Sequence, residues 1–235
     1  MKKIEDVLSE FNIDPGKLKS LLGQKGFRLL ADDEIAETKE WLENYQLGIE
    51  LFPVITNDES DFIGVYMEKP LLNKIALMQH HNLDFTPKFK DLNSLIKNIE
   101  NGFITRDNDW EDFRNNFDYP SQNATTAYEH SIIGTLHQEL EDKRNSNDRY
   151  ELLASTIMVL TPYEKVEDIY QFLEDENIFV RQKCVSVLGD FYQHEPIKEK
   201  IRETLKTINN KILEKKVYNG SLVETKKGFW KSLFK

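Results

Sequence analysis

The chain has 235 residues, with 31 Lys or Arg against 41 Asp or Glu, which gives a formal net charge of −10. At 39% hydrophobic and 31% charged residues, the composition excludes a disordered chain, and the length allows one large domain or two small ones. No apolar run approaches the roughly 20 residues of a membrane helix, and the N-terminus turns acidic before any apolar stretch. Neither an integral membrane association nor a signal peptide is therefore expected, and a cytoplasmic location follows as the default.

The net charge is unevenly distributed along the chain. It is −7 over residues 1–110, −9 over 111–175 and +6 over 176–235. An acidic surface repels nucleic acid and attracts basic proteins, so no nucleic-acid partner is expected. The same acidity also serves solubility alone, and the sequence leaves both explanations open.

The first 45 residues carry apolar side chains at helical spacing. This pattern predicts three short helices, over 3–11, 15–22 and about 33–45. Asp14 before Pro15 suits the start of the second helix, and Asp32 or Asp33 suits the N-cap of the third.

The periodicity then changes to that of β-strands. Three strands are predicted, over 48–55, 62–67 and 74–80, separated by polar turns. Pro53 in the first strand indicates a sheet edge or a bulge. Strands so close in sequence favour an antiparallel meander, and a helix near 91–101 closes the unit.

The rest of the chain is predicted to be helical. An α+β domain over 1–110 is followed by a connector over 111–125, an all-α domain over 126–217 and a basic, aromatic tail over 218–235. The helices are expected at 126–143, 147–160, 163–174, 178–193 and 196–217. The tail pattern suits docking on the acidic body, a frayed end or a membrane surface.

Several segments between Leu30 and Ile99 follow one another in a distinctive order. They are Leu51-Phe52-Pro53-Val54, the acidic turn Asp58-Glu59-Ser60-Asp61, Phe62-Ile63-Gly64-Val65-Tyr66, Lys74-Ile75-Ala76-Leu77, His80-His81 and the closing Phe89–Ile96. In order and spacing this stretch resembles the SUKH superfamily, which includes the yeast Smi/Knr cell-wall regulators and many bacterial immunity proteins. The resemblance implies a small antiparallel or mixed sheet flanked by helices, and a protein-binding function. In the helical half, the pattern around Val180-Arg181 and Leu188-Gly189 is similar to a HEAT-like helix pair.

No residue pattern predicts a metal, a cofactor or a catalytic nucleophile. Adjacent residues on a strand point to opposite faces, so His80 and His81 cannot ligate one metal together. Cys184 is expected to be a small core residue. An enzyme is not expected; it would require a carboxylate that orients a ring nitrogen of His80 or His81 for general-base work.

The resemblance, together with the lack of a catalytic pattern and the acidic body, implies a non-enzymatic immunity protein that neutralises a toxin, such as a nuclease, by direct contact. A basic toxin domain would meet the acidic body with electrostatically steered association. The alternative is an intracellular scaffold or regulator of the Smi/Knr type, which recognises its partner through the helical half. The oligomeric state is left open. Exposed acids and aromatic anchors are expected to form the partner-binding site, namely Asp58, Glu59, Asp61, Tyr66, His80, His81 and Asp84.

Overall fold

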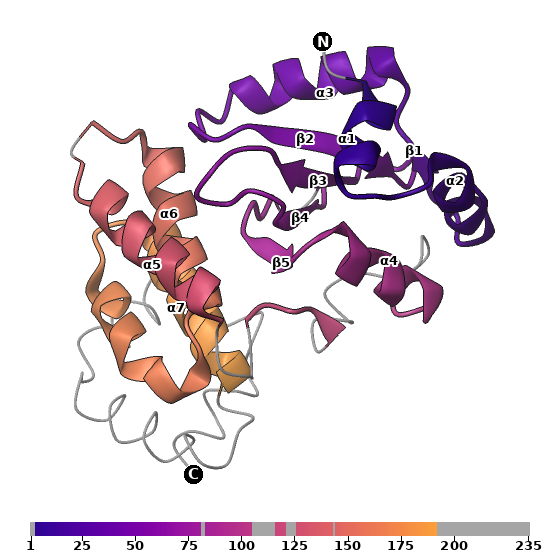
Figure 1. The fold of residues 1–235 in the computed structure, drawn as a ribbon. Helices are drawn as coiled ribbons and strands as arrows, with labels where there is room; N and C mark the ends of the chain where they lie inside the picture. Colours follow the sequence, from indigo (N-terminus) through magenta and orange to yellow (C-terminus); the bar gives the residue numbers. More distant parts are fainter. Residues whose placement is uncertain (1–2, 81–82, 105–115, 121–125, 143, 192–235) are drawn as a thin grey trace. The chain divides into compact units, whose positions relative to one another are not determined.

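A computed structural model describes residues 3–80, 83–104, 116–120, 126–142 and 144–191 (Figure 1). The chain divides into two compact units, Met1–Tyr119 with Gly134–Thr156, and Pro120–Ile133 with Ile157–Lys235. None of the helices in the described ranges combines the length and the apolar character that crossing a bilayer requires.

The first unit contains a five-stranded antiparallel sheet in the order β1-β2-β3-β4-β5 (Figure 1). Each strand pairs with the next one along the chain, which confirms the predicted α+β meander. Three strands lie where the periodicity placed them, and two short edge strands were not predicted. The strands are β1 (Arg28–Leu29), β2 (Leu51–Thr56), β3 (Phe62–Tyr66), β4 (Ile75–Met78) and β5 (Pro87–Phe89).

The position of Pro53 in the sheet decides between the two predicted explanations, an edge or a bulge. β2 lies between β1 and β3, so Pro53 is not on an edge strand. The alternative was a bulge, and the β2–β3 register does shift between Pro53 and Ile55. A bulge tolerates the missing N–H of proline because the ladder of hydrogen bonds is interrupted there.

Helices pack on the sheet around one hydrophobic core. The side chains of Ile63 and Val65 on β3 and of Ile75 and Leu77 on β4 belong to a core shared with apolar residues of all four helices of this unit's N-terminal part. These helices are α1 (Ile4–Glu10), α2 (Pro15–Gln24), α3 (Asp32–Glu43) and α4 (Leu92–Glu100).

Side-chain caps fix where the helices begin. Asp14 accepts the backbone N–H of Lys17 at 2.9 Å, as predicted for the start of α2. The predicted N-cap of α3 is wrong, because Ala31 occupies that position. Glu34 accepts the backbone N–H of Ala31 at 2.8 Å and so satisfies this helix end in place of an aspartate.

The opposite face of the sheet is also buried. Gly64 at the centre of β3 lies beneath the side chains of Leu51 and Met78, which are 4% and 1% exposed. Tyr66, two residues along the same strand and therefore on the same face, is fully buried. Both faces of β3 are thus packed.

From residue 126 onward the described chain is helical, as predicted. Tyr163–Glu174 differs from the expectation because it is a 3₁₀ helix with non-helical dihedral angles at Lys165. It packs against α7 (Ile178–Phe191), and Cys184 is buried there with its Sγ donating to the carbonyl of Ile169 at 3.3 Å. The HEAT-like assignment stays a prediction, and the expected helix at 196–217 and the tail lie outside the described residues. The helices are α5 (Ala127–Leu140), α6 (Asn147–Leu160), η2 (Tyr163–Glu174) and α7 (Ile178–Phe191).

Candidate functional site

The turn between β2 and β3 is organised by the amide of Asn57. Its Oδ1 accepts the backbone N–H groups of Glu59 at 2.9 Å and of Asp61 at 3.3 Å. Asp58 and Ser60 adopt left-handed backbone conformations, with φ of 65° and 68°. Asparagine and aspartate side chains favour such turns because they hydrogen-bond to backbone groups two residues on. Asn57 was missed as a site residue, although its type at a predicted turn was a usable signal.

Asp61 forms a dyad with His80 across the end of the β3–β4 pair. One carboxylate oxygen of Asp61 lies 2.9 Å from both the backbone N and the ring Nδ1 of His80, and the other accepts the Asn57 amide at 2.9 Å. Asp61 is only 7% exposed, so the expectation of an exposed acid is wrong at this position. The side chain of His80 is 57% exposed.

The Asp61–His80 contact fixes the tautomer of the imidazole. A carboxylate only accepts hydrogen bonds, so Nδ1 of His80 carries the proton and Nε2 is the basic nitrogen of the neutral ring. This is the carboxylate that a general-base histidine requires. The same contact also ties the β2–β3 turn to the chain that follows β4.

Arg28 connects the turn to the start of α3. Its guanidinium donates to both carboxylate oxygens of Glu34, at 2.6 and 2.5 Å, and to Asp58 at 2.7 Å. The hydrogen bonds from Arg28, and then from the Ala31 N–H, lower the pKa of Glu34 to about 2. The pKa of Arg28 is raised, chiefly by its hydrogen bond to Glu34 and then by the one to Asp58.

Removing Arg28 is expected to reduce stability in a pH-dependent manner. Because the folded-state pKa of Glu34 lies below its usual 4.5, its contribution is complete above about pH 4.5 and is lost as the pH falls towards 2. Glu34 is 36% exposed, so solvent screening limits the loss in Arg28→Gln to about 1 kcal/mol at pH 7. Urea unfolding at pH 7 and pH 3 measures it.

Lys19→Gln is the control for this prediction. Lys19 is exposed on α2, and its replacement removes the same positive charge as Arg28→Gln. A difference between Arg28→Gln and the wild type that stayed constant from pH 7 to pH 3 would contradict the assignment to Glu34.

A second polar group lies around β5. The carboxylate of Asp84 accepts the backbone N–H and the hydroxyl of Thr86, at 3.0 and 2.6 Å, and pairs with the ammonium of Lys88. The hydroxyl of Tyr66 donates to the carbonyl of Phe85 at 2.6 Å. Burial, and then the charge of Asp84, raises the pKa of Tyr66. Tyr66 is therefore not the exposed anchor that was expected, and Asp84 serves to hold the chain before β5.

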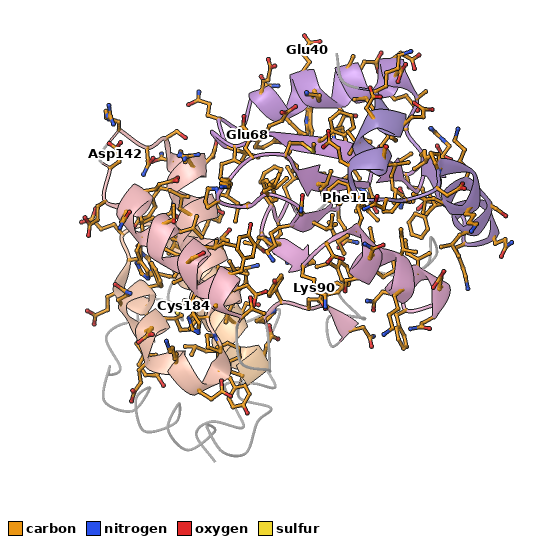
Figure 2. All side chains as sticks on the ribbon, viewed as in Figure 1. Phe11, Glu40, Glu68, Lys90, Asp142 and Cys184 are labelled. Atoms are coloured by element: carbon orange, nitrogen blue, oxygen red, sulfur yellow. The ribbon has the colours of Figure 1, made fainter. Side chains whose placement is uncertain are left out.

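The segment 29–68 is the most acidic part of the first unit. It holds 11 acidic side chains and one lysine, so its net charge of −10 equals that of the whole chain. The lysine, Lys39, is itself paired with Glu50 at 2.5 Å. Figure 2 shows Glu40 on α3 pointing away from the sheet. We call the exposed carboxylates of α3 and the turn the acidic surface; its members are Asp32, Asp33, Glu37, Glu40, Glu43, Asp58 and Glu59.

An aromatic row lies on the flank of α3 beside the acidic surface. The ring of Trp41 contacts those of Tyr45 and Phe62, with centroids 5.0 and 6.4 Å away, and Tyr45 contacts Phe85 at 5.1 Å. All four side chains are half-buried. The structure thus brings aromatic and acidic groups together, but through Trp41 on α3 and Tyr45 just after it, neither of which was a predicted site residue. Their exposure depends on which flank of α3 faces the sheet, whereas the periodicity of apolar residues in the sequence marks only the buried stripe of the helix.

The predicted site residues therefore separate into three groups. Asp58 and Glu59 belong to the acidic surface, whereas Asp61, Tyr66 and Asp84 hold the structure together. His80 is exposed beside Asp61, and His81 lies outside the described residues. Within the part of the chain that the structure describes, no three His, Cys, Asp or Glu side chains gather as metal ligands.

Comparisons with known proteins add no family assignment. No protein-family model matches the chain, and neither curated proteins nor solved structures include a match. The resemblance to the SUKH superfamily therefore stays a prediction from the sequence.

Proposed function

We propose that this chain is a protein-binding module of the SUKH type, an immunity protein that neutralises a basic toxin domain by direct contact. The observation that carries the proposal is the concentration of net charge −10 in residues 29–68, with the seven exposed carboxylates of the acidic surface on α3 and the β2–β3 turn. A basic partner would be drawn to this surface by long-range attraction.

The arrangement of acids on α3 supports binding rather than solubility alone. Asp33, Glu37 and Glu40 follow one another at spacings of four and three residues, so they are neighbours on the exposed face of the helix. Like charges at this spacing destabilise a helix by about 0.2–0.5 kcal/mol per pair. A bound cationic surface would relieve this repulsion, whereas solubility would be served as well by dispersed charges.

The first test is to identify the partner. The intact, tagged protein is used to capture proteins from its native host at low and moderate salt, and mass spectrometry identifies them. We expect one basic, toxin-like protein whose capture declines as salt rises. Recovery of several housekeeping proteins instead would favour the alternative function, an intracellular scaffold or regulator.

Charge reversal on α3 then tests the surface itself. In the triple variant Asp33→Lys, Glu37→Lys and Glu40→Lys, we expect the association rate constant with the captured partner to fall by about tenfold at low salt, because the steering field is removed. Stopped-flow or biosensor kinetics over a salt series measure this rate constant.

A matched control carries the same change of charge in the second unit. Glu164→Lys, Glu167→Lys and Asp168→Lys replace three exposed acids of η2. This control should bind at close to the wild-type rate. Loss of binding in the control and not in the α3 variant would transfer recognition to the helical half, as the scaffold function requires.

The Asp61–His80 dyad favours a second candidate, an enzyme in which His80 is a general base. The supporting observation is the 2.9 Å contact that orients the ring. A His80→Ala variant that bound the captured partner normally but lost biological activity would favour this candidate over the immunity function.

A further inference from the structure

We propose that the aromatic row of Trp41, Tyr45, Phe62 and Phe85 makes the acidic surface select arginine-rich over lysine-rich segments of its partner. The inference rests on the proposed function, because it assumes a basic partner at this surface. It adds the side-chain chemistry by which that partner is recognised.

The aromatic row lies beside an exposed carboxylate of the acidic surface. Trp41 follows Glu37 by four residues on α3, so the indole and this exposed carboxylate are neighbours along one flank. Tyr45 lies four residues beyond Trp41, and its ring contacts Phe85. A cation that approaches Glu37 therefore meets a half-buried indole beside it.

The first turn of α3 already binds one guanidinium, that of Arg28. Arg28 donates in parallel to both carboxylate oxygens of Glu34, which lies one turn before Glu37 and Thr38 on the same helix. Such paired hydrogen bonds match the planar fork of arginine and cannot be formed by a lysine ammonium. One carboxylate of α3, that of Glu34, thus accepts a guanidinium in this paired arrangement.

Aromatic rings distinguish a guanidinium from an ammonium group. A guanidinium stacks on an aromatic face and is only weakly hydrated, whereas an ammonium keeps its water more strongly. Beside a carboxylate and an indole, an arginine can therefore donate hydrogen bonds to the carboxylate while its guanidinium plane stacks on the ring. A bare acidic surface would attract both cations through charge alone and would not distinguish them.

Trp41 lies on a different flank of α3 from Lys39, the one lysine in residues 29–68. Lys39 pairs with Glu50 and lies over the ring of Phe52, 5.5 Å from its centroid. Trp41 lies two positions after Lys39, which places the two side chains about 200° apart around the helix. No internal cation from α3 therefore covers Trp41.

The experiment compares hexa-arginine and hexa-lysine peptides as probes of the intact chain, by calorimetry at two salt concentrations. We expect hexa-arginine to bind about two- to fivefold more tightly, the preference that one exposed cation–π contact provides. Trp41→Leu should remove this preference while both peptides still bind in a salt-dependent manner. Trp41→Phe, which keeps a ring, should retain part of the preference and guards against a folding defect in the leucine variant.

Phe103→Leu is the matched control, because Phe103 is 39% exposed in the same unit but lies away from α3 in sequence, after α4. It should bind both peptides as the wild type does. Equal affinity for the two peptides, or a preference that survives in Trp41→Leu, would overturn this inference and leave the proposed function intact. Binding of neither peptide would overturn both. Binding that required removal of residues 218–235 would assign the surface to the chain's own tail and overturn the partner proposed here.

Discussion

Replacing Gly64 with valine is expected to lower the free energy of unfolding by about 3 kcal/mol, since overfilling a packed core costs this order of energy. A Cβ at this position would lie 2.9 Å from Cδ1 and 3.0 Å from Cγ of Leu51, and 3.2 Å from Cε of Met78. Leu51 and Met78 are buried and have little room to move away. Urea unfolding monitored by circular dichroism measures the loss, as a lower midpoint at constant slope.

Two further variants separate crowding from loss of backbone freedom. Gly64→Ala adds only the Cβ and should cost less than valine. The same change should cost less in a Leu51→Ala background than in the wild type, because the contacted side chain is then absent. Gly23→Ala on α2 is the control, since a Cβ there meets nothing within 4 Å. A Gly64→Val variant as stable as the wild type would contradict the packing described for this face of the sheet.

Replacing Asp61 with alanine is expected to destabilise the first unit by about 3 kcal/mol. The change removes the acceptor of two donors, the backbone N–H of His80 just after β4 and the side-chain amide of Asn57 in the β2–β3 turn. A buried donor that loses its acceptor costs about 1–3 kcal/mol. Thermal and urea unfolding at pH 7 measure the effect.

Asp58→Ala is the control for this second prediction. Asp58 lies three residues earlier in the same turn, but its side chain is 47% exposed and its ion pair with Arg28 is at the surface. It should cost well under half as much as Asp61→Ala. Equal losses in the two variants would show that the carboxylate of Asp61 has no special structural role.

The fold was largely predictable because it depends on periodicity and on local stop signals. Short apolar runs separated by polar turns located β2, β3 and β4, and Asp14 with Pro15 located the start of α2. The edge strands were missed because two or three residues show no period, and β1 exists only through its pairing with Thr56 and Ile55.

The site was less predictable because exposure depends on tertiary neighbours. Asp58 and Asp61 occupy the same acidic turn, yet one is exposed and the other is buried by the side chains it binds. Tyr66 is polar at its tip and suited an exposed anchor, but the carbonyl of Phe85 satisfies its hydroxyl inside the unit. Phe85 lies 19 residues after Tyr66, and no local sequence pattern predicts this contact.

The guanidinium of Arg28 places folding and recognition in opposition. It neutralises two carboxylates, Glu34 and Asp58, that a cationic partner would otherwise meet, so the chain acts as its own competitor at this point. A partner able to displace Arg28 from Asp58 would gain an anion while leaving Glu34 still paired. Weaker ion pairing by Arg28 would therefore make the surface more negative and the fold less stable.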